Sequence, residues 1–299
     1  MSVAIAVLVN PIAGRGRGAR TADAVVPHLR RAGLQVLRLQ GEDVEESASL
    51  AHAAVADGVD GLVVVGGDGM VHLAAQALNG TGVPLGVIPA GTGNDTALAL
   101  GVSAKDPLHA ADVVIGGHQR SIDLADVGGR VFVTVLAAGF DSLVNERANR
   151  MRWPRGQMRY NLATLAELRV FRPIHYTLEL DGESRDLDAM LVAVGNTASY
   201  GGGLRMCEGA EPDDGLLDVV VIKPLSKPEL VRVFPRLFKG THTSHPQFER
   251  HRVETVSIAA AGVIGYADGE RVGPLPMTAR VLPGALRVYA AEPGAPHVR

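Results

Sequence analysis

One short unit recurs in the first hundred residues: an apolar strand, a glycine-rich loop and then a helical pattern. The strand Leu62–Val65 runs directly into the loop GGDG (residues 66–69), and a helical pattern follows at once. Two further loops, Asn10–Arg20 and Pro89–Asp95, also follow apolar strands. Strands that alternate with helices predict a parallel sheet with helices on both faces. Ligands of such sheets bind beyond the carboxyl ends of the strands, so we expect the three loops to line one crevice.

The pattern changes at about Ser121. β-Branched runs separated by glycine- and aspartate-containing turns dominate from there on, which is typical of an antiparallel sandwich or a related all-β domain. Helical patterns interrupt these runs at about residues 142–171 and 226–239. The expected fold class is therefore α/β plus all-β, with an α/β domain over residues 1–120 and a β domain over residues 121–299.

Composition excludes several classes of protein. The formal net charge of -3 gives no general attraction to nucleic acid or to anionic membranes, so such contacts need a local patch. The single cysteine, Cys207, excludes an intramolecular disulfide and makes a cysteine-based metal site improbable. No apolar run approaches the roughly 18 to 20 residues of a membrane span. If the protein acts on membranes, we expect it to act from the surface.

The glycine loops have the chemistry of a phosphate site. Glycine lets the backbone approach a ligand closely, and the N–H groups at a helix N-terminus favour phosphate. Asp68 would repel phosphate, so it suggests a Mg²⁺ ion, a metal-bound water or a ribose hydroxyl. Each feature also has a simpler interpretation. Asp68 would cap a turn, Asp95 would cap a helix, and Asn10–Arg20 would be a solvated basic loop. That last loop is neither a dinucleotide fingerprint nor a P-loop.

The order of the motifs resembles the diacylglycerol kinase catalytic-domain family, which includes bacterial soluble lipid kinases and sphingosine kinases and shares its nucleotide domain with NAD kinases. The resemblance covers most of the chain. It is carried by GGDG (66–69), PAGTGND (89–95), NPIAG (10–14), AAGFD (137–141), GNTASYGGG (195–203), PDDGLLDVVV (212–221) and YADGE (266–270). It implies a three-layer α/β nucleotide-binding domain with a parallel sheet, then an antiparallel β-sandwich lipid domain. It also implies an active site in the cleft and a segment after about residue 283 that packs back on the first domain.

The resemblance also assigns roles in catalysis. Asp268 matches the catalytic base, and Glu270 and Asp68 match the carboxylates that organise Mg²⁺; composition alone would make residues 268–270 a plain hairpin turn. The residues implied to bind the ATP cofactor are Asn10, Gly14, Gly66, Gly67, Asp68, Gly69, Gly91, Thr92, Asn94 and Asp95.

A second Mg²⁺ site is implied in the motif PDDGLLD. Its ligands would be the Asp214 side chain and the backbone carbonyls of Glu211 and Leu216, since hard cations prefer oxygen. The alternative is an Asp-Gly turn before the strand that follows.

Residues 147–160 hold five arginines interleaved with methionines and aromatics, and no acid. A solvated helix face, single-stranded nucleic acid and a membrane surface all fit this composition. The resemblance favours the membrane, with contacts from Arg147, Arg150, Arg152, Trp153 and Arg155. We therefore expect a cytoplasmic protein at the inner membrane face with a lipid partner and no nucleic-acid partner. A homodimer through an exposed sheet edge stays open.

The sequence departs from the family at two positions near the phosphates. Met70 stands where threonine is usual, and Leu98 where arginine is frequent. The expected function is an ATP- and Mg²⁺-dependent lipid kinase that phosphorylates the hydroxyl of diacylglycerol or a similar long-chain alcohol. The alternatives are a NAD kinase and a catalytically weak protein that binds lipid or nucleotide for regulation.

Overall fold

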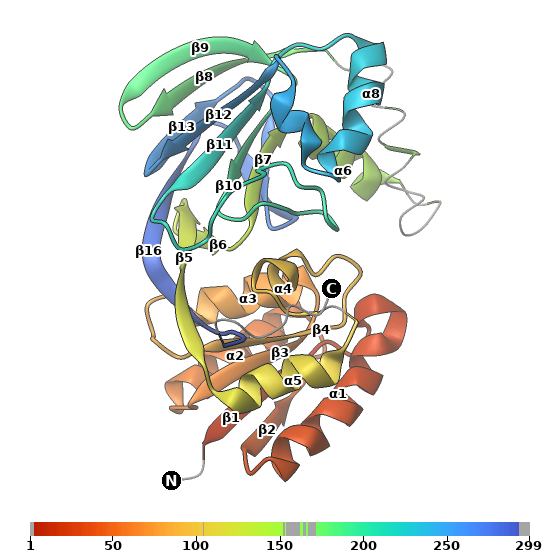
Figure 1. Ribbon diagram of the computed structural model, residues 1–299, viewed down its shortest axis with the longest axis vertical. Coiled ribbons are helices and arrows are strands. Elements are labelled where there is room, and N and C mark those ends of the chain that lie inside the picture. The colour runs from red at the N-terminus through yellow and green to blue at the C-terminus, as the bar shows by residue number, and fades with distance from the viewer. Residues whose placement is uncertain are drawn as a thin grey trace.

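The computed structural model describes residues 3–103, 105–151, 153, 162–163, 166 and 172–292, which form two domains joined by long strands (Figure 1). The elements of the first domain are β1 (Ala4–Val9), α1 (Ala13–Arg31), β2 (Gln35–Leu39), α2 (Val44–Ala56), β3 (Gly61–Gly66), α3 (Asp68–Leu78), β4 (Leu85–Pro89), α4 (Asp95–Ala99) and α5 (Pro107–Gly116).

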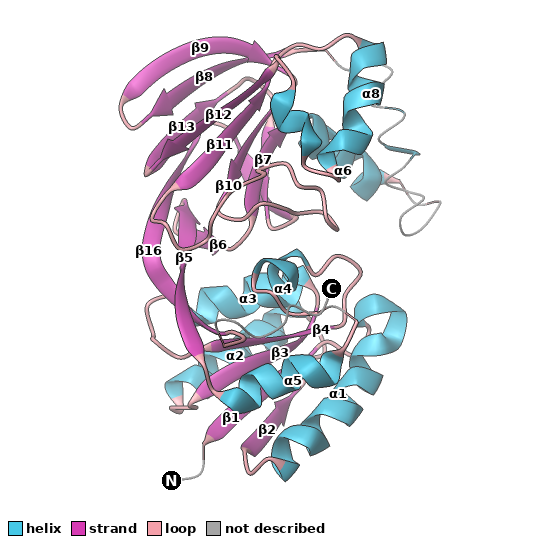
Figure 2. Ribbon diagram, viewed as in Figure 1, coloured by secondary structure: helices cyan, strands magenta, loops and turns pink. Residues whose placement is uncertain are grey.

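The first domain has three layers. Strands β2, β1, β3 and β4 pair in that order, all parallel. Helices α1 and α5 pack together on one face, and α2 and α3 pack together on the other (Figure 2). The central strand β3 is buried along its whole length, because helices cover both faces of the sheet. The predicted three-layer α/β domain is confirmed.

The second domain is a sandwich. Its elements are β5 (Gln119–Val127), β6 (Arg130–Phe132), β7 (Val135–Gly139), α6 (Phe140–Arg150), β8 (Ile174–Leu180), β9 (Glu183–Ala189), β10 (Leu191–Gly195), β11 (Leu217–Ile222), α8 (Lys227–Leu237), η1 (Thr241–Ser244), β12 (Phe248–Val253), β13 (Thr255–Ala259), β14 (Ile264–Ala267), β15 (Glu270–Pro274) and β16 (Met277–Tyr289).

Two sheets enclose the core of this domain. One has the order β12-β11-β10-β7-β14-β15, and it faces β16, β13, β8 and β9 of the other. Side chains such as Tyr176, Val192 and Val256 fill the space between the sheets. The outer face of the first sheet carries α6 and α8, which share a second apolar cluster with it. The predicted β-sandwich is confirmed. Among the described residues, no helix combines the length and apolarity needed to cross a bilayer.

Two long strands connect the domains. The predicted boundary near Ser121 falls within β5, which pairs with β16 along both of their halves. The first half of β16 pairs with β13, and Val288 near its end pairs with Leu85 of β4. Leu286 and Val288 are fully buried in the core of the first domain. The chain after residue 283 therefore returns to the sheet of the first domain, and β5 and β16 connect the two domains (Figure 1).

Candidate active site

The three glycine loops touch one another at the carboxyl ends of β1, β3 and β4. A Cβ atom on Gly91 would lie 2.5 Å from Cα of Gly67, and one on Gly14, whose φ is +55°, would overlap the carbonyl oxygen of Ala90. Side chains at these points would force the loops apart, so the contact requires glycine. The Arg17 guanidinium adds a link, because it donates to the carbonyl of Gly91 at 2.7 Å.

Asp68 and Asp95 flank the third loop from two sides. Asp68 accepts the N–H groups of Asn94 (2.8 Å) and Thr96 (3.1 Å). A Cβ on Gly93 would lie 2.7 Å from Oδ2 of Asp68 and 3.4 Å from Oδ2 of Asp95. Burial raises the pKa of Asp68 most strongly, the Thr96 N–H offsets part of that rise, and the charge of Asp95 raises the pKa further. Two carboxylates held this close form an acidic pair where the GGDG loop meets the third glycine loop.

Asp95 reaches the second domain instead of capping its own helix. Its oxygens accept the N–H groups of Gly202 at 2.6 Å and Gly203 at 2.8 Å. The residue that caps α4 is Asn94, with φ of +63° and no side-chain cap bond. The simpler reading of Asp95 as a helix cap is therefore wrong, because its side chain bridges the cleft.

The remaining predicted nucleotide residues build the loops themselves. The Asn94 side chain holds Gly91 through two hydrogen bonds of 2.9 and 3.1 Å, and the carbonyl of Gly66 accepts the N–H of Ala90 at 2.7 Å. Asn10 Oδ1 accepts the N–H of Ile12 within the first loop. Thr92 is exposed at the tip of the third loop. Their contact with ATP stays a prediction.

Asp268 lies in the two-residue turn of the hairpin β14–β15, which faces this crevice. Asp268 and Gly269 have φ of +52° and +83°, the signs that a type I′ turn requires. The next residue, Glu270, places Oε1 3.8 Å from where a Cβ of Gly69 would be. Residues 268–270 therefore form a hairpin turn and also include two carboxylates. The turn brings Glu270 to the GGDG loop.

The carboxylate of Asp268 is buried and fully hydrogen-bonded. It accepts the N–H of Val133 (2.9 Å), the N–H and the hydroxyl of Thr134 (2.7 and 2.6 Å) and pairs with Nδ1 of His72 (2.9 Å). These bonds also explain why the apolar run 130–140 forms two strands, since the N–H groups of 133 and 134 turn to Asp268 instead of a neighbouring strand.

Helix α3 ties the GGDG loop to the second domain. His72 contacts Asp268, and one turn later the Gln76 amide donates to the carbonyl of Val131 (2.6 Å) and accepts its N–H (3.1 Å). The sequence did not indicate a role for these two residues, nor for Gly93 and Arg17. Gly93 lies inside the motif PAGTGND and Arg17 inside the loop Asn10–Arg20, whereas the contact between residues 72 and 268 has no local signal.

Met70 points away from the crevice. Its side chain is buried and packs against Gly66, where a Cβ would lie 2.6 Å from Cγ of Met70. Met70, in place of the threonine usual in the family, therefore changes the packing beneath the GGDG loop.

At the second predicted Mg²⁺ site, the Asp214 carboxylate bonds to other groups of the protein. The Asp214 carboxylate pairs with Arg252 and accepts the N–H of Leu216 at 3.0 Å. Because a guanidinium already neutralises this carboxylate, the arrangement does not favour a resident Mg²⁺. The site at Asp214, Glu211 and Leu216 stays a prediction that competes with an observed ion pair.

The arginine-rich segment is described only in part. Arg152 and Arg155 lie outside the described residues. Arg150 pairs with Glu146 at 3.3 Å, and Tyr266 and Arg271 also bond that carboxylate. The Tyr266 hydroxyl contributes most to lowering the pKa of Glu146. Glu146 therefore links α6 to the hairpin β14–β15, whereas the Arg150 side chain is 82% exposed.

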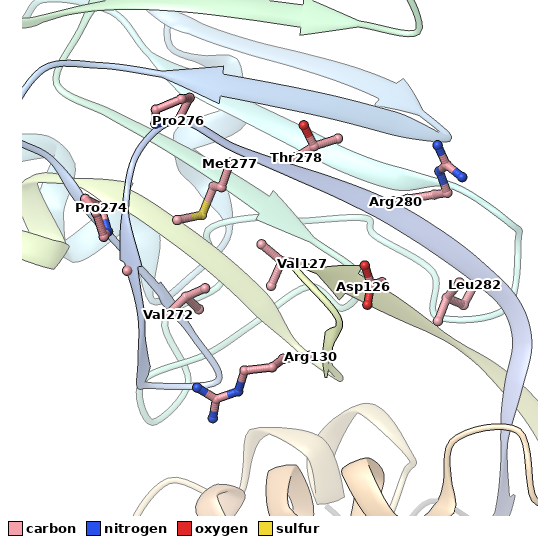
Figure 3. Close-up of a pocket in the computed structure, with 12 residues that line it drawn as sticks. Asp126, Val127, Arg130, Val272, Pro274, Pro276, Met277, Thr278, Arg280 and Leu282 are labelled. Carbon is pink, nitrogen blue, oxygen red and sulfur yellow. The ribbon is translucent and has the colours of Figure 1, made fainter.

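A cavity of about 670 Å³ opens beside the same hairpin (Figure 3). Its walls come from the β5–β6 hairpin, the end of β15 and the start of β16. Most of the lining is apolar, including Val127, Val272 and Met277, while Arg130 and Arg280 supply positive charge and Asp126 a negative one. Val272 is two residues from Glu270, so the cavity adjoins the acidic turn.

Comparison with known proteins decides the family. Residues 4–127 match the family described as "Diacylglycerol kinase catalytic domain", and residues 134–290 match the "YegS C-terminal NAD kinase beta sandwich-like domain". A curated diacylglycerol kinase of Mycobacterium tuberculosis is 45% identical over 97% of this chain and 96% of the relative. This chain belongs to the diacylglycerol kinase family. It is therefore a kinase, an enzyme that transfers phosphate.

More distant proteins share the fold of this diacylglycerol kinase family member. A curated diacylglycerol kinase of Bacillus subtilis is 28% identical over 90% of both chains. The crystal structure of a diacylglycerol kinase from Bacillus anthracis matches with a TM-score of 0.75 at 20% identity, covering 97% of both chains. The structure of an NAD kinase from Archaeoglobus fulgidus in complex with ATP matches with a TM-score of 0.56 at 15% identity, covering 97% of this chain and 94% of that one.

Proposed function

We propose that this kinase transfers the γ-phosphoryl group of ATP, with Mg²⁺, to the hydroxyl of diacylglycerol or a similar long-chain lipid alcohol at a membrane surface. The observation that carries the proposal is the convergence of three glycine loops, from one domain, with the acidic turn Asp268–Glu270 from the other. Phosphoryl transfer requires such positioning of phosphates, charge neutralisation and a proton acceptor near the hydroxyl.

The nucleotide end of the crevice suits the phosphates of ATP. The loops present backbone close to a ligand, and α3 begins at Asp68, so its first N–H groups open toward the loops. The similarity to an ATP-bound NAD kinase supports a nucleotide site on this fold. The name of the 45% identical relative supports diacylglycerol as the acceptor.

The acidic groups fit a Mg²⁺ ion that arrives with the nucleotide. Among the described residues, no group of three or more histidine, cysteine or acidic side chains is close enough to hold a metal by itself. Mg²⁺ commonly uses one or two carboxylates together with substrate phosphates and water. Asp68 belongs to the GGDG loop and Glu270 lies beside Gly69 of the same loop, so these two carboxylates would hold the ion, and Asp95 would stay tied to Gly202 and Gly203. When bound, the ion neutralises charge on the transferring phosphate.

The cavity beside the turn suits an acyl chain. Its volume of about 670 Å³ lies in the range of small-molecule sites, and its lining is mostly apolar. An acceptor whose chain occupies the cavity would place its hydroxyl toward Asp268 and Glu270, because β15 runs from Glu270 directly into the cavity wall.

The end of the second domain that carries α6 and α8 suits a membrane surface (Figure 1). Trp153 is 79% exposed, and α8 exposes Val231 and its C-cap residue Phe238 by 60% and 48%. Arg232 and Lys239, next to Val231 and Phe238 in sequence, are also exposed. Exposed apolar side chains flanked by cations favour anionic lipid headgroups. We therefore keep Arg147 and Trp153 in the proposed contact and add the exposed face of α8.

The test is transfer of labelled γ-phosphate from ATP with Mg²⁺ to diacylglycerol, monoacylglycerol, sphingosine and ceramide in mixed micelles, and to free NAD⁺. The proposal expects a labelled phospholipid that requires Mg²⁺, with Glu270→Gln strongly reduced. A labelled NADP⁺ product would make the protein a NAD kinase. ATP binding without transfer to any acceptor would support the regulatory alternative.

A further inference from the structure

The Asp268 carboxylate is held mainly by the short segment between β6 and β7. The N–H of Val133 and the N–H and hydroxyl of Thr134 donate to it at 2.9, 2.7 and 2.6 Å. The backbone of Asp268 is placed separately, because its own N–H donates to the carbonyl of Val135 at 3.1 Å, next to the pairing of β14 with β7. The ladder therefore sets the position of the residue, and residues 133 and 134 set the direction of its carboxylate.

Residues 133 and 134 are held in turn by Asn196, which directly follows β10. Asn196 Nδ2 donates to the carbonyl of Val133 at 3.0 Å. The N–H groups of Asn196 and Thr197 donate to the carbonyl of Thr134 at 2.8 and 3.2 Å. The segment is thus bonded to Asp268 through its N–H groups and to residues 196 and 197 through its carbonyl groups.

The buried position of Asn196 requires two hydrogen-bond donors. The residue is fully buried, and Nδ2 lies between two carbonyl oxygens, that of Val133 and that of Asp123 at 2.9 Å. An amide NH₂ group supplies two donors, whereas a hydroxyl supplies one and an ionised carboxylate none. Because a buried carbonyl without a donor is costly, a side chain with fewer donors would favour movement of the segment that carries Val133.

The second carbonyl belongs to a residue of β5 that is itself fixed. The Asp123 carboxylate accepts the N–H groups of Gly215 and Gly284, each at 2.7 Å, and the residue is buried. Gly284 lies where the register between β16 and β5 shifts. Asn196 therefore ties the segment that holds Asp268 to the two strands that connect the domains.

We propose that Asn196 is a positioning residue for phosphoryl transfer, because its amide fixes residues 133 and 134 and these direct the Asp268 carboxylate. The inference rests on the proposed lipid kinase function and deepens it, since it adds a residue that acts through Asp268 without touching either substrate. The glycine loops that we assign to ATP belong to the first domain, so loss of Asn196 should lower kcat and leave KM for ATP nearly unchanged. A misplacement of about 1 Å in a catalytic group can lower a rate about 10²-fold.

The rival role for Asn196 is to stabilise the sandwich without affecting Asp268. Asn196→Ala removes both side-chain donors, and Asn196→Ser, whose hydroxyl can still donate one hydrogen bond, is the second variant. Tyr176→Phe is the matched control, because it removes a buried hydrogen bond to the carbonyl of Ala138 on β7. A double-mutant cycle with Asp268→Asn separates the two roles, since a residue that acts only through a carboxylate has no effect once that carboxylate is gone.

The experiment measures kcat and KM for ATP and diacylglycerol, urea unfolding of each variant, and hydrogen exchange of the amides of residues 133 and 134 without substrates. We expect Asn196→Ala to lower kcat about 10- to 100-fold, to keep KM for ATP within about threefold and to lower the protection of both amides. Tyr176→Phe should keep both kcat and that protection. In the Asp268→Asn background, Asn196→Ala should change kcat by less than about twofold.

Four results overturn the inference, and they leave the proposed function in different states. If the wild type phosphorylates lipid and Asn196→Ala has the kcat of Tyr176→Phe, the positioning role is wrong and the proposed function stands. The same holds if Asn196→Ala lowers kcat equally with and without the Asp268 carboxylate. If neither Asn196→Ala nor Asn196→Ser folds, Asn196 serves folding instead. If the wild type phosphorylates no lipid, the proposed function falls first, and the inference falls with it.

Discussion

Asp95→Asn should loosen the contact between the two domains. The Asp95 carboxylate accepts the N–H groups of Gly202 and Gly203 at 2.6 and 2.8 Å, and the residue is only 2% exposed. An asparagine oxygen can keep one of these bonds, but its NH₂ group then faces the other N–H. Since a hydrogen bond to a charged group contributes about 1.5–3 kcal/mol, losing one and neutralising the other should weaken the contact by about 2–4 kcal/mol.

Hydrogen exchange of the amides of residues 200–204, without ATP or Mg²⁺, measures this contact apart from catalysis. At 1.4 kcal/mol per factor of ten, protection of these amides should fall about 30- to 700-fold in Asp95→Asn. Asp106→Asn is the control, because Asp106 caps α5 within the first domain and asparagine caps helices equally well. Equal protection of residues 200–204 in Asp95→Asn and the wild type would refute the bridging role.

Three further outcomes follow from the structure. Gly93→Ala should lower kcat/KM for ATP at least about tenfold in steady-state assays, because its Cβ would lie 2.7 Å from Oδ2 of Asp68. Arg250→Met should lower the free energy of urea unfolding by about 3–5 kcal/mol at pH 7, because it leaves Asp218 buried and unpaired. Burial already raises the pKa of Asp218 in the folded state, so this loss should vanish below the unfolded pKa of about 3.9 and grow as pH rises; equal losses at pH 4 and pH 7 would contradict it. Phe238→Glu should weaken sedimentation with anionic vesicles more than with neutral ones, because it removes an apolar contact and adds a negative charge, and unchanged binding to both would remove α8 from the membrane contact.

The sequence was sufficient for the first domain because its signals are local. Strands β1, β3 and β4 are apolar runs that lead into the glycine loops, and the loops meet because the strand ends share one edge. Helix α1 begins at Ala13, but Gly14, Arg15 and Gly16 all have positive φ within it. The regular part of the helix therefore follows the glycine loop, as its composition indicates.

The edges of the sandwich and the contacts across the cleft were not predictable in this way. Strand β9 reads ESRDLDA and is mostly exposed, so it lacks the apolar pattern by which strands are recognised, and charge on an edge strand prevents pairing with other chains. The contact of His72 with Asp268 joins residues 196 apart in sequence. Only the path of β5 and β16 brings these residues together, and no local pattern encodes that path.

Lipid phosphorylation at the hairpin turn is tested by transfer of labelled phosphate from ATP to diacylglycerol in mixed micelles, with the wild type and Asp268→Asn. We expect labelled phosphatidic acid from the wild type and a loss on the order of 10²- to 10⁴-fold in the variant, with both proteins equally folded. Equal transfer by both proteins would contradict the placement of the active site at the hairpin turn. Transfer to NAD⁺ in place of lipid would contradict the lipid kinase itself.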